Sequence, residues 1–247
     1  MKKVKKMKKK KKKSAYQMLE IGLIVIFLIS AALIYPDIAE RIRAMRQNNE
    51  IQQTGPTSAQ DETGNTPQAT ISELKKINSD MIGWIYIDGT NINYPIVQHT
   101  DNDYYLTHLY NNEPNSAGSI FMDYQNDAAF SDQNTLIYGH SRLDGTMFAQ
   151  LRKLKEQSFV DQHPNITIYT ETETAEYKII SVNVVSDTYN YRSLDIGNNL
   201  ETYIESMIQS SCIQTDTAIT DTDKIITLST CTNVIEDGRL IVIAKLI

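Results

Sequence analysis

Cysteine is scarce in this chain of 247 residues, which contains two, Cys212 and Cys231. Neither belongs to a CxxC pair, and the sequence has no HxxH spacing, carboxylate cluster or glycine-rich phosphate loop. These absences exclude the common zinc and phosphate-binding motifs, so we expect no metal and no cofactor. If the domain is exported, the two cysteines could still form one disulfide, depending on where each points.

Basic residues are also sparse outside the N-terminus. Ten of the 24 Lys and Arg lie between Lys2 and Lys13, which leaves 14 against 29 Asp and Glu in residues 36–247, a net charge of −15. The overall net charge of −6 hides this segregation. An acidic folded part argues against nucleic acid as a partner.

The polybasic segment, residues 1–15, precedes an apolar segment, residues 16–35, whose only charge is Glu20. At helical rise the apolar segment spans about 30 Å, enough to cross a bilayer if Glu20 snorkels toward the headgroups. The positive-inside rule keeps the lysines in the cytoplasm and places everything after Tyr35 outside the cell. A cleaved signal peptide is the alternative, but "ISAAL" is a poor cleavage site. We therefore expect a single-pass membrane anchor with an extracellular domain.

Residues 36–69 separate this anchor from the folded domain. Residues 36–52 are typical of a short amphipathic helix, whereas residues 53–70 are polar, contain Pro and Gly, and lack hydrophobic periodicity. A helix is predicted from Thr70, which can act as the cap with Glu73 three residues later. The folded domain is therefore predicted over residues 70–247, in which no internal repeat is visible.

Short β-rich runs separated by turn residues dominate that domain and predict a barrel or a sandwich. The runs lie at 83–87, 91–97, 118–123, 134–139, 165–170, 175–186, 224–231 and 239–247. Two helices interrupt them. The first is predicted over 145–154 with Asp144 as a possible cap.

The second helix is predicted from Asn198 to Cys212. Asn198 and Glu201 have the spacing of a capping box, and apolar residues recur at helical spacing along one face. Extending that apolar face by one turn reaches Cys212, which is therefore interpreted as a buried core residue.

Cys231 is expected in a different environment, because it ends the strand "KIITLSTC". Alternation places it on one face with Ser229, and that face becomes more polar toward the cysteine. If the next strand returns antiparallel, Arg239 lies beside Cys231. A guanidinium there could favour a thiolate or stabilise a developing oxyanion, as expected of a reacting site.

A thiol nucleophile also requires a base, and histidine is the usual one. His99, His108 and His163 lie in polar contexts typical of surface residues. His140 instead ends the run "NTLIYGH", where Gly139 could allow an unusual backbone turn. His140, Cys231 and Arg239 therefore all lie at strand ends and form the candidate catalytic set.

"NTLIYGH", "TLSTC" and "GRLIVIAKL" together resemble the sortases, the membrane-anchored cysteine transpeptidases of Gram-positive bacteria. "INYPIVQHTDNDYYL", "GSIFMDYQND" and "DGTMFAQLRKL" are similar to class B of that family, as is the helix over 198–212. No DPW or DPF motif precedes the domain, which argues against the pilus-building class C. The resemblance implies an eight-stranded β-barrel, mainly β with accessory helices.

The resemblance also implies a reaction. Cys231 would attack the carbonyl of a threonine in a C-terminal sorting signal, His140 would transfer protons, and Arg239 would hold the carbonyl or the oxyanion. The amine of a peptidoglycan precursor of the lipid II type would then resolve the thioacyl enzyme, anchoring the protein to the cell wall.

Three further residues are candidates for lining the substrate groove. They are Tyr138, Ser229 and, by similarity, Asn102, for which a turn or cap role is an equal alternative. Two other functions stay open at this point: a sortase that polymerises pilins, and a membrane-tethered binding domain in which Cys231 is merely packed.

Overall fold

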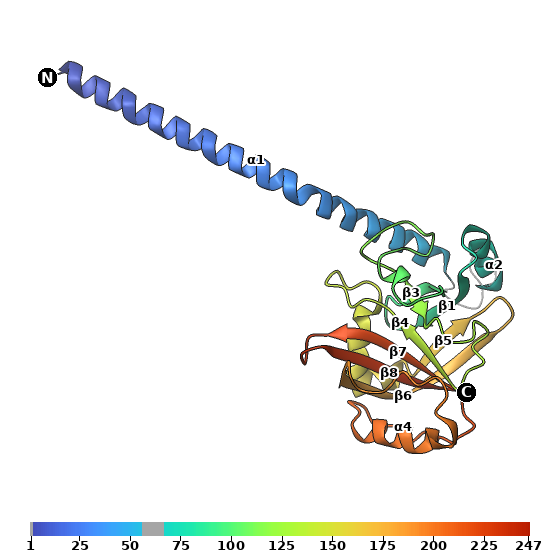
Figure 1. Ribbon diagram of the computed structural model, residues 1–247. Coiled ribbons are helices and arrows are strands. Elements are labelled where there is room, and N and C mark those ends of the chain that lie inside the picture. Colours follow the sequence, from blue (N-terminus) through green and yellow to red (C-terminus); the bar gives the residue numbers. More distant parts are fainter. Residues whose placement is uncertain (1, 56–66) are drawn as a thin grey trace. The chain divides into compact units, whose positions relative to one another are not determined.

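The computed structural model describes residues 2–55 and 67–247 (Figure 1). Along the sequence, the chain divides between Arg46 and Gln47 into two compact units. The first unit consists of most of helix α1 (Lys2–Thr54). The stretch Tyr16–Gln52 contains a window of mean hydropathy 2.5 and, among the described residues, is long and apolar enough to cross a membrane. The amphipathic helix predicted over residues 36–52 is part of the same helix, α1.

The second unit includes residues that the composition assigned to a juxtamembrane helix and linker. Ile51 is buried in a cluster with Trp84, and Gln52 Nε2 donates to the Asn91 carbonyl at 2.7 Å. A Cβ added to Gly55 would lie 2.1 Å from Trp84 Cζ2, so this glycine packs directly on the indole ring. Residues 56–66 of the predicted linker lie outside the described residues.

All eight predicted strands are present and close into one barrel in the order β1-β2-β3-β4-β7-β8-β6-β5. Most pairs are antiparallel, but β2 pairs with β3, and β4 with β7, in parallel. The bounds are β1 (Met81–Ile87), β2 (Asn93–Val97), β3 (Ile120–Met122), β4 (Asn134–Tyr138), β5 (Asn165–Tyr169), β6 (Thr174–Ser186), β7 (Ile225–Thr232) and β8 (Gly238–Leu246).

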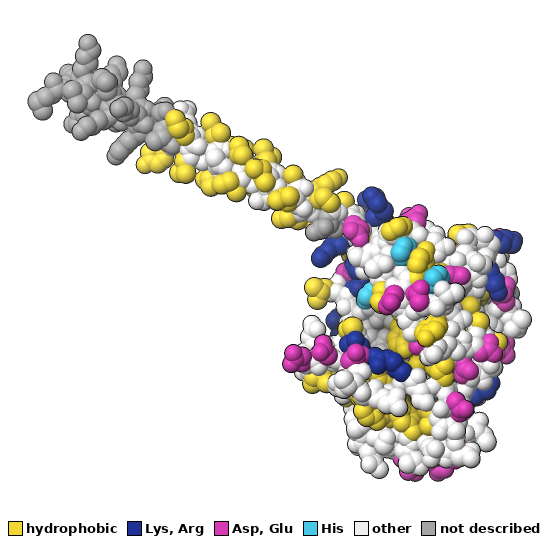
Figure 2. Space-filling view, in the orientation of Figure 1, with side chains coloured by type: hydrophobic (Ala, Val, Ile, Leu, Met, Phe, Trp, Pro, Cys, Tyr) yellow, Lys and Arg dark blue, Asp and Glu magenta, His cyan; other side chains and the backbone are white. Residues whose placement is uncertain are grey.

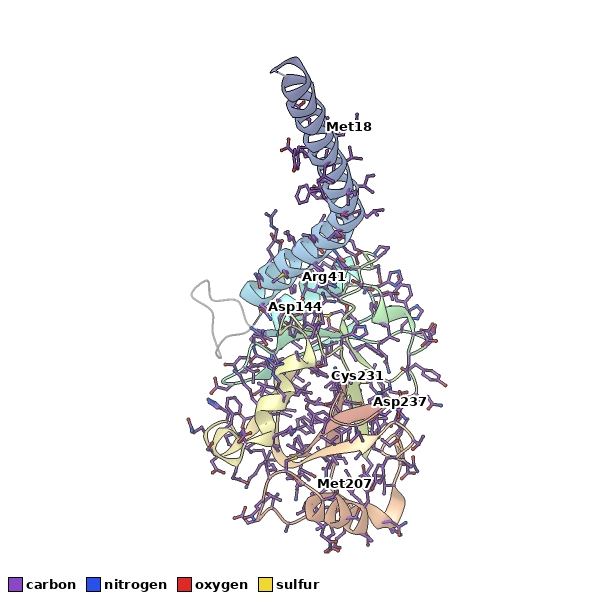
Figure 3. All side chains as sticks on the ribbon, turned by 90° about the vertical axis from the view of Figure 1, so that its left-hand side faces the viewer. Met18, Arg41, Asp144, Met207, Cys231 and Asp237 are labelled. Carbon is purple, nitrogen blue, oxygen red and sulfur yellow. The ribbon has the colours of Figure 1, made fainter. Side chains whose placement is uncertain are left out.

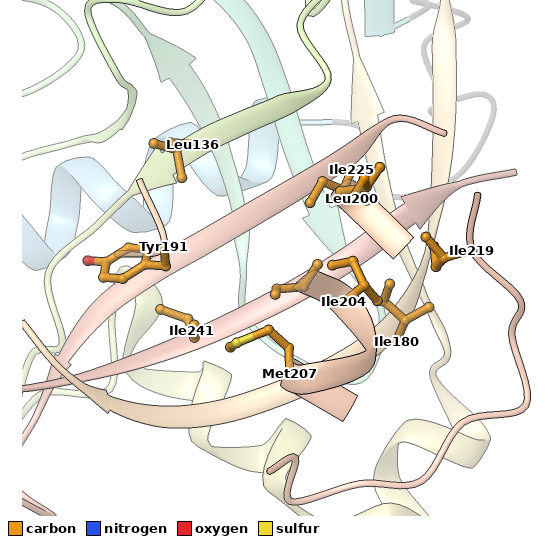
Figure 4. Packing of buried hydrophobic residues seen from close by; sticks show 10 residues of the cluster. Leu136, Ile180, Tyr191, Leu200, Ile204, Met207, Ile219, Ile225 and Ile241 are labelled. Atoms are coloured by element: carbon orange, nitrogen blue, oxygen red, sulfur yellow. The ribbon is translucent and has the colours of Figure 1, made fainter. Parts of the chain in front are cut away.

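Helix α4 (Leu200–Gln209) covers one face of the strands β4, β7, β8 and β6 (Figure 4). Its apolar face presents Leu200, Ile204 and Met207, all buried against strand residues such as Ile225 and Ile241. Spacing of i, i+4 and i+7 places these side chains on one side of the helix. Tyr138, Ser229 and Cys231 belong to the same strand face, and Tyr138 packs against this cluster.

The predicted cap of helix α4 is wrong. A 3-10 turn, η3 (Gly197–Asn199), precedes the helix, and neither Asn198 nor Asn199 makes a side-chain cap. Instead the backbone N–H of Glu201 donates to Asp221 Oδ1 at 3.0 Å. A carboxylate from a distant loop therefore caps the helix, which local spacing cannot reveal.

Helix α4 also ends earlier than its apolar periodicity predicts, and the burial predicted for Cys212 is wrong. Ser210 leaves the helical conformation, and the Ser211 hydroxyl accepts a hydrogen bond from the Val182 N–H at 3.0 Å. Cys212 thus follows the helix, and its thiol is exposed and free. The apolar face of the helix does not continue past Gln209, because Ser211 forms a hydrogen bond with strand β6 instead of continuing the helix.

The remaining helices differ from expectation in smaller ways. Helix α2 (Pro67–Ile77) begins at a proline rather than at the predicted cap Thr70, as expected for the first turn of a helix. The helix predicted over 145–154 is a 3-10 helix, η2 (Phe148–Lys155), followed by the unpredicted α3 (Gln157–Gln162). Asp144 Oδ1 accepts from the Thr146 N–H and hydroxyl instead of capping η2. A further 3-10 turn is η1 (Tyr104–Leu106).

Candidate active site

The parallel strands β4 and β7 bring His140 and Cys231 to one edge of the barrel. Tyr138 pairs with Ser229, and the Gly139 N–H donates to the Ser229 carbonyl at 3.3 Å. Two residues beyond this pair lie His140 and Cys231. Because the carboxyl ends of parallel strands meet at the same edge, residues 91 positions apart in the sequence become neighbours in the fold.

Gly139 is a glycine for a reason other than the one predicted. Its φ is not positive, so the backbone there does not use the left-handed conformation that favours glycine. An added Cβ would instead lie 2.4 Å from Ile120 Cδ1 and 2.9 Å from Phe148 Cδ2. Close packing under the site excludes any side chain at this position.

Cys231 and Arg239 lie directly opposite each other in the antiparallel pair β7–β8, as the hairpin predicted. Such opposite residues have Cβ atoms about 5 Å apart. The Cys231 thiol is free and exposed at the end of a strand whose preceding residues are buried. Figure 3 shows it close to the β7–β8 turn, where Asp237 lies.

Two contacts hold the Arg239 guanidinium. Nη1 donates to the Gly238 carbonyl at 3.1 Å, and Nη2 lies 3.2 Å from Asp187 Oδ1. Asp187 also pairs with Arg192. The hydrogen bond from Arg192, together with the charges of Arg192 and Arg239, holds the pKa of Asp187 below its usual range. The carboxylate therefore stays ionised and orients both arginines.

His140 is oriented by a backbone carbonyl. Its Nε2 lies 2.8 Å from the Leu106 oxygen, which can only accept a hydrogen bond. Nε2 therefore carries the hydrogen, and in the neutral ring Nδ1 is the atom free to accept a proton. This contact orients the ring in the groove that Cys231 also lines.

A buried carboxylate, Asp123, holds two of the predicted site residues, Asn102 and Tyr138. Asp123 is buried, and its Oδ2 accepts from Asn102 Nδ2 and from the Tyr138 hydroxyl, each at 2.9 Å. The Asn102 Oδ1 accepts the Tyr124 N–H at 3.0 Å. Burial, followed by the Asp123 charge, raises the pKa of Tyr138, so the phenol remains a donor. Asn102 is thus anchored to Asp123 rather than to His140.

Ser229 is satisfied by a residue that the sequence did not single out. Its hydroxyl lies 2.8 Å from the Tyr191 hydroxyl, and the Arg192 guanidinium lies 4.5 Å from the centre of the Tyr191 ring. Tyr191 and Arg192 both belong to the segment between β6 and η3. This segment and η1, which contributes Leu106, both line the site.

These residues line one groove of about 380 Å³, and all six predicted site residues are in it. Figure 2 shows this face, with hydrophobic side chains gathered in a hollow and basic side chains at its margin. The groove is lined by Asn102, Leu106, Phe121, Tyr138, Gly139, His140, Tyr191, Arg192, Ser229, Thr230, Cys231 and Arg239. We refer to it below as the peptide groove.

The sequence did not identify Asp123, Asp187, Tyr191 or Arg192. Each acts through a partner far away along the chain, and no local spacing marks such a partner. Only Asp123 lay within a segment, "GSIFMDYQND", that the resemblance had drawn on. Among the described residues, no group of three His, Cys, Asp or Glu side chains is placed to bind a metal.

Comparison with known proteins decides the family. The family model described as Sortase domain matches residues 85–247. The chain is 40% identical to Sortase B of Listeria monocytogenes over 181 residues, covering 72% of this chain and 74% of that protein. The chain belongs to the sortase family. Sortases are cysteine transpeptidases that act on sorting signals.

Further relatives place this sortase in class B. Sortase B of Staphylococcus aureus is 34% identical over 178 residues, covering 70% of this chain and 73% of that protein. The Staphylococcus aureus sortase B–substrate complex matches with a TM-score of 0.75 at 30% identity, over 85% of this chain and 98% of that one. Sortase B from Bacillus anthracis in complex with AAEK1 matches with a TM-score of 0.71 at 37% identity, over 87% and 99%. The non-catalytic binding domain considered above is excluded.

Proposed function

We propose that Cys231, His140 and Arg239 carry out the transpeptidation and that the peptide groove holds the sorting signal. The observation that carries this assignment is the convergence of the three residues from β4, β7 and β8 on one groove. Cys231 is an exposed residue one position before the end of β7, Arg239 lies opposite it, and His140 follows β4 at the same edge. These are the nucleophile, the oxyanion donor and the proton carrier of an acyl transfer.

In the first half-reaction the Cys231 thiolate attacks the carbonyl carbon of the threonine at the cleavage site. Arg239 donates to the oxygen as negative charge develops on it. The peptide C–N bond then breaks, and His140 gives the departing amine the proton that its Nδ1 took from the Cys231 thiol when the thiolate formed. The product is a thioester between Cys231 and the threonine.

In the second half-reaction an acceptor amine attacks the thioester. A C–N bond forms, the C–S bond breaks with its electron pair returning to Cys231, and the proton of the amine passes to His140. The proposed acceptor is a peptidoglycan precursor of the lipid II type, so that the product is a wall-anchored protein. The apolar stretch of α1 serves as a membrane anchor, with the lysine-rich N-terminus in the cytoplasm and the barrel outside.

Mass spectrometry of the intact full chain, in detergent micelles with peptides that carry candidate sorting signals, tests this assignment. We expect an adduct on Cys231 equal in mass to the peptide up to its threonine. Cys231→Ala should abolish the adduct, whereas Cys212→Ala should retain it. An adduct on Cys212, or cleavage by the Cys231→Ala protein, would refute the assignment.

A further inference from the structure

A second groove, on the other side of Cys231, plays no part in the description above. It has a volume of about 490 Å³ and lies between η2 and the β7–β8 connection. Thr230 and Cys231 line it as well as the peptide groove, whereas His140 and Arg239 line the peptide groove but not this one. The nucleophile therefore stands on the ridge between two grooves.

The second groove is basic although the domain around it is acidic. Three cations line it, Arg142, Arg152 and Lys155, and none of its described lining residues is Asp or Glu. By contrast, Asp and Glu outnumber Lys and Arg by 29 to 14 over residues 36–247. Positive charges that converge in a groove raise the local concentration of anions.

The conformation of η2 explains why two of these cations point the same way. Side chains three residues apart eclipse each other in a 3-10 helix, so Arg152 and Lys155 share a side. Leu151 and Leu154 are fully buried and fix the orientation of the helix. No carboxylate among the described residues pairs with Arg152 or Lys155, so their charges remain available to a ligand.

Arg142 completes the basic wall in a fixed position. Its Nε donates to Asp144 Oδ2 at 3.1 Å, and its Nη1 donates to the Ser116 carbonyl at 3.1 Å. Its charge is thus partly offset by Asp144. Arg152 and Lys155 are left as the two cations without a counter-charge.

The order of the reaction decides which substrate this groove can take. When the acceptor amine arrives, the acylated peptide still fills the peptide groove. Two further cavities reach Cys231: the second groove, and one of about 440 Å³ along the β7–β8 connection that Glu236 and Asp237 line. Of these two, the second groove is the one whose lining contains several cations and no Asp or Glu. We propose that it binds the acceptor, and that the acceptor carries a negatively charged group, carboxylate or phosphate, which Arg152 and Lys155 hold while its amine reaches the thioester. This inference rests on the proposed function, because it assumes the thioester on Cys231.

The test compares acceptors that differ by one anionic group, using the full chain in detergent micelles. Triglycine against triglycinamide reports on a carboxylate, and diglycyl-phosphoethanolamine against diglycyl-ethanolamine reports on a phosphate. Each supplies an unhindered glycyl amine. The acceptor KM is obtained from the ratio of aminolysis to hydrolysis products, and release of the leaving peptide without acceptor measures acylation separately.

The variant is Arg152→Gln combined with Lys155→Gln. The matched control is Lys153→Gln, which removes a charge from the same helix. The Lys153 ammonium donates to the Gly89 carbonyl at 3.1 Å and lies 5.5 Å from the centre of the Phe159 ring, outside the groove. We expect the double variant to raise the KM of the anionic acceptors about three- to tenfold, as for two partly exposed ion pairs. Acylation and the KM of the neutral acceptors should not change, and added salt should reduce the difference.

An effect confined to triglycine identifies a carboxylate, one confined to the phosphate compound identifies a phosphate, and either supports the proposal. Anionic and neutral acceptors with equal KM ratios in wild type and double variant overturn it. A second measurement is independent of transpeptidation: the rates at which an anionic and a cationic methanethiosulfonate modify Cys231. If the double variant leaves that rate ratio unchanged, the proposal fails. If instead no thioester forms while the ratio falls, the proposed function has failed.

Discussion

Arg239→Lys separates charge from geometry at the candidate oxyanion site. Arginine has a planar fork, and here one arm donates to the Gly238 carbonyl while the other lies 3.2 Å from Asp187. Lysine keeps the charge but has a single ammonium on a flexible stem. It therefore cannot keep both contacts and also donate to the substrate carbonyl that Cys231 attacks. We expect kcat to fall about a hundredfold or more, as for the removal of an oxyanion donor.

A hundredfold loss corresponds to about 2.7 kcal/mol of transition-state stabilisation. The cost to folding should be much smaller. The Arg239 and Asp187 side chains are 26% and 40% exposed, and ion pairs of that exposure contribute at most about 1 kcal/mol. The variant should therefore retain nearly the melting temperature of the wild type while losing turnover.

The assay is cleavage of a fluorogenic sorting peptide by the full chain, with kcat and KM determined separately and thermal unfolding recorded in parallel. Asp187→Asn is the companion variant, because it leaves Arg239 in place but removes the carboxylate that orients it. We expect about a tenfold loss of kcat there, between the wild type and Arg239→Lys. Near-normal kcat in Arg239→Lys, or a loss explained entirely by unfolding, would show that Arg239 has only a structural role.

The remaining predictions concern the two thiols, the domain boundary and pH. A bound sorting peptide should slow methanethiosulfonate modification of Cys231 but not of Cys212, and Cys212→Ala should change the free energy of unfolding by less than about 0.5 kcal/mol because its thiol is exposed; protection of Cys212 would contradict this. A fragment starting at residue 70 is still predicted to fold and to cleave, but its fluorescence should be red-shifted relative to a fragment starting at 47, because residues 47–55 cover the sole tryptophan, Trp84. Gly55→Ala in the longer fragment should shift the emission the same way and cost about 1–3 kcal/mol; identical spectra would show that this packing does not occur in solution. The pKa of Asp187 is lowered in the folded protein, so its stabilisation is present above about pH 4 and is lost as pH falls through the folded pKa; the stability difference between wild type and Asp187→Asn, within about 1 kcal/mol, should be constant from about pH 5 to 8 and vanish in stronger acid.

The strands and the pairing of Cys231 with Arg239 could be predicted because they follow from local rules. Alternating side chains fix which face of a strand a residue occupies, and a short connection between antiparallel strands fixes which residues lie opposite. Residues 231 and 239 are thus brought together by a turn that can be counted along the sequence. His140 joined the set through its place at a strand end, but its proximity to Cys231 depends on the parallel pairing of β4 with β7, which only the resemblance implied.

Where a feature depends on partners distant in the sequence, the tertiary structure alone decided it. The burial predicted for Cys212 failed because β6 captures the Ser211 hydroxyl after the helix ends. The cap of α4 comes from Asp221, and the anchor of Asn102 and Tyr138 from the buried Asp123. Periodicity describes the free energy of one segment against an average interior, whereas these contacts are hydrogen bonds between individual groups whose positions are set by the closed barrel.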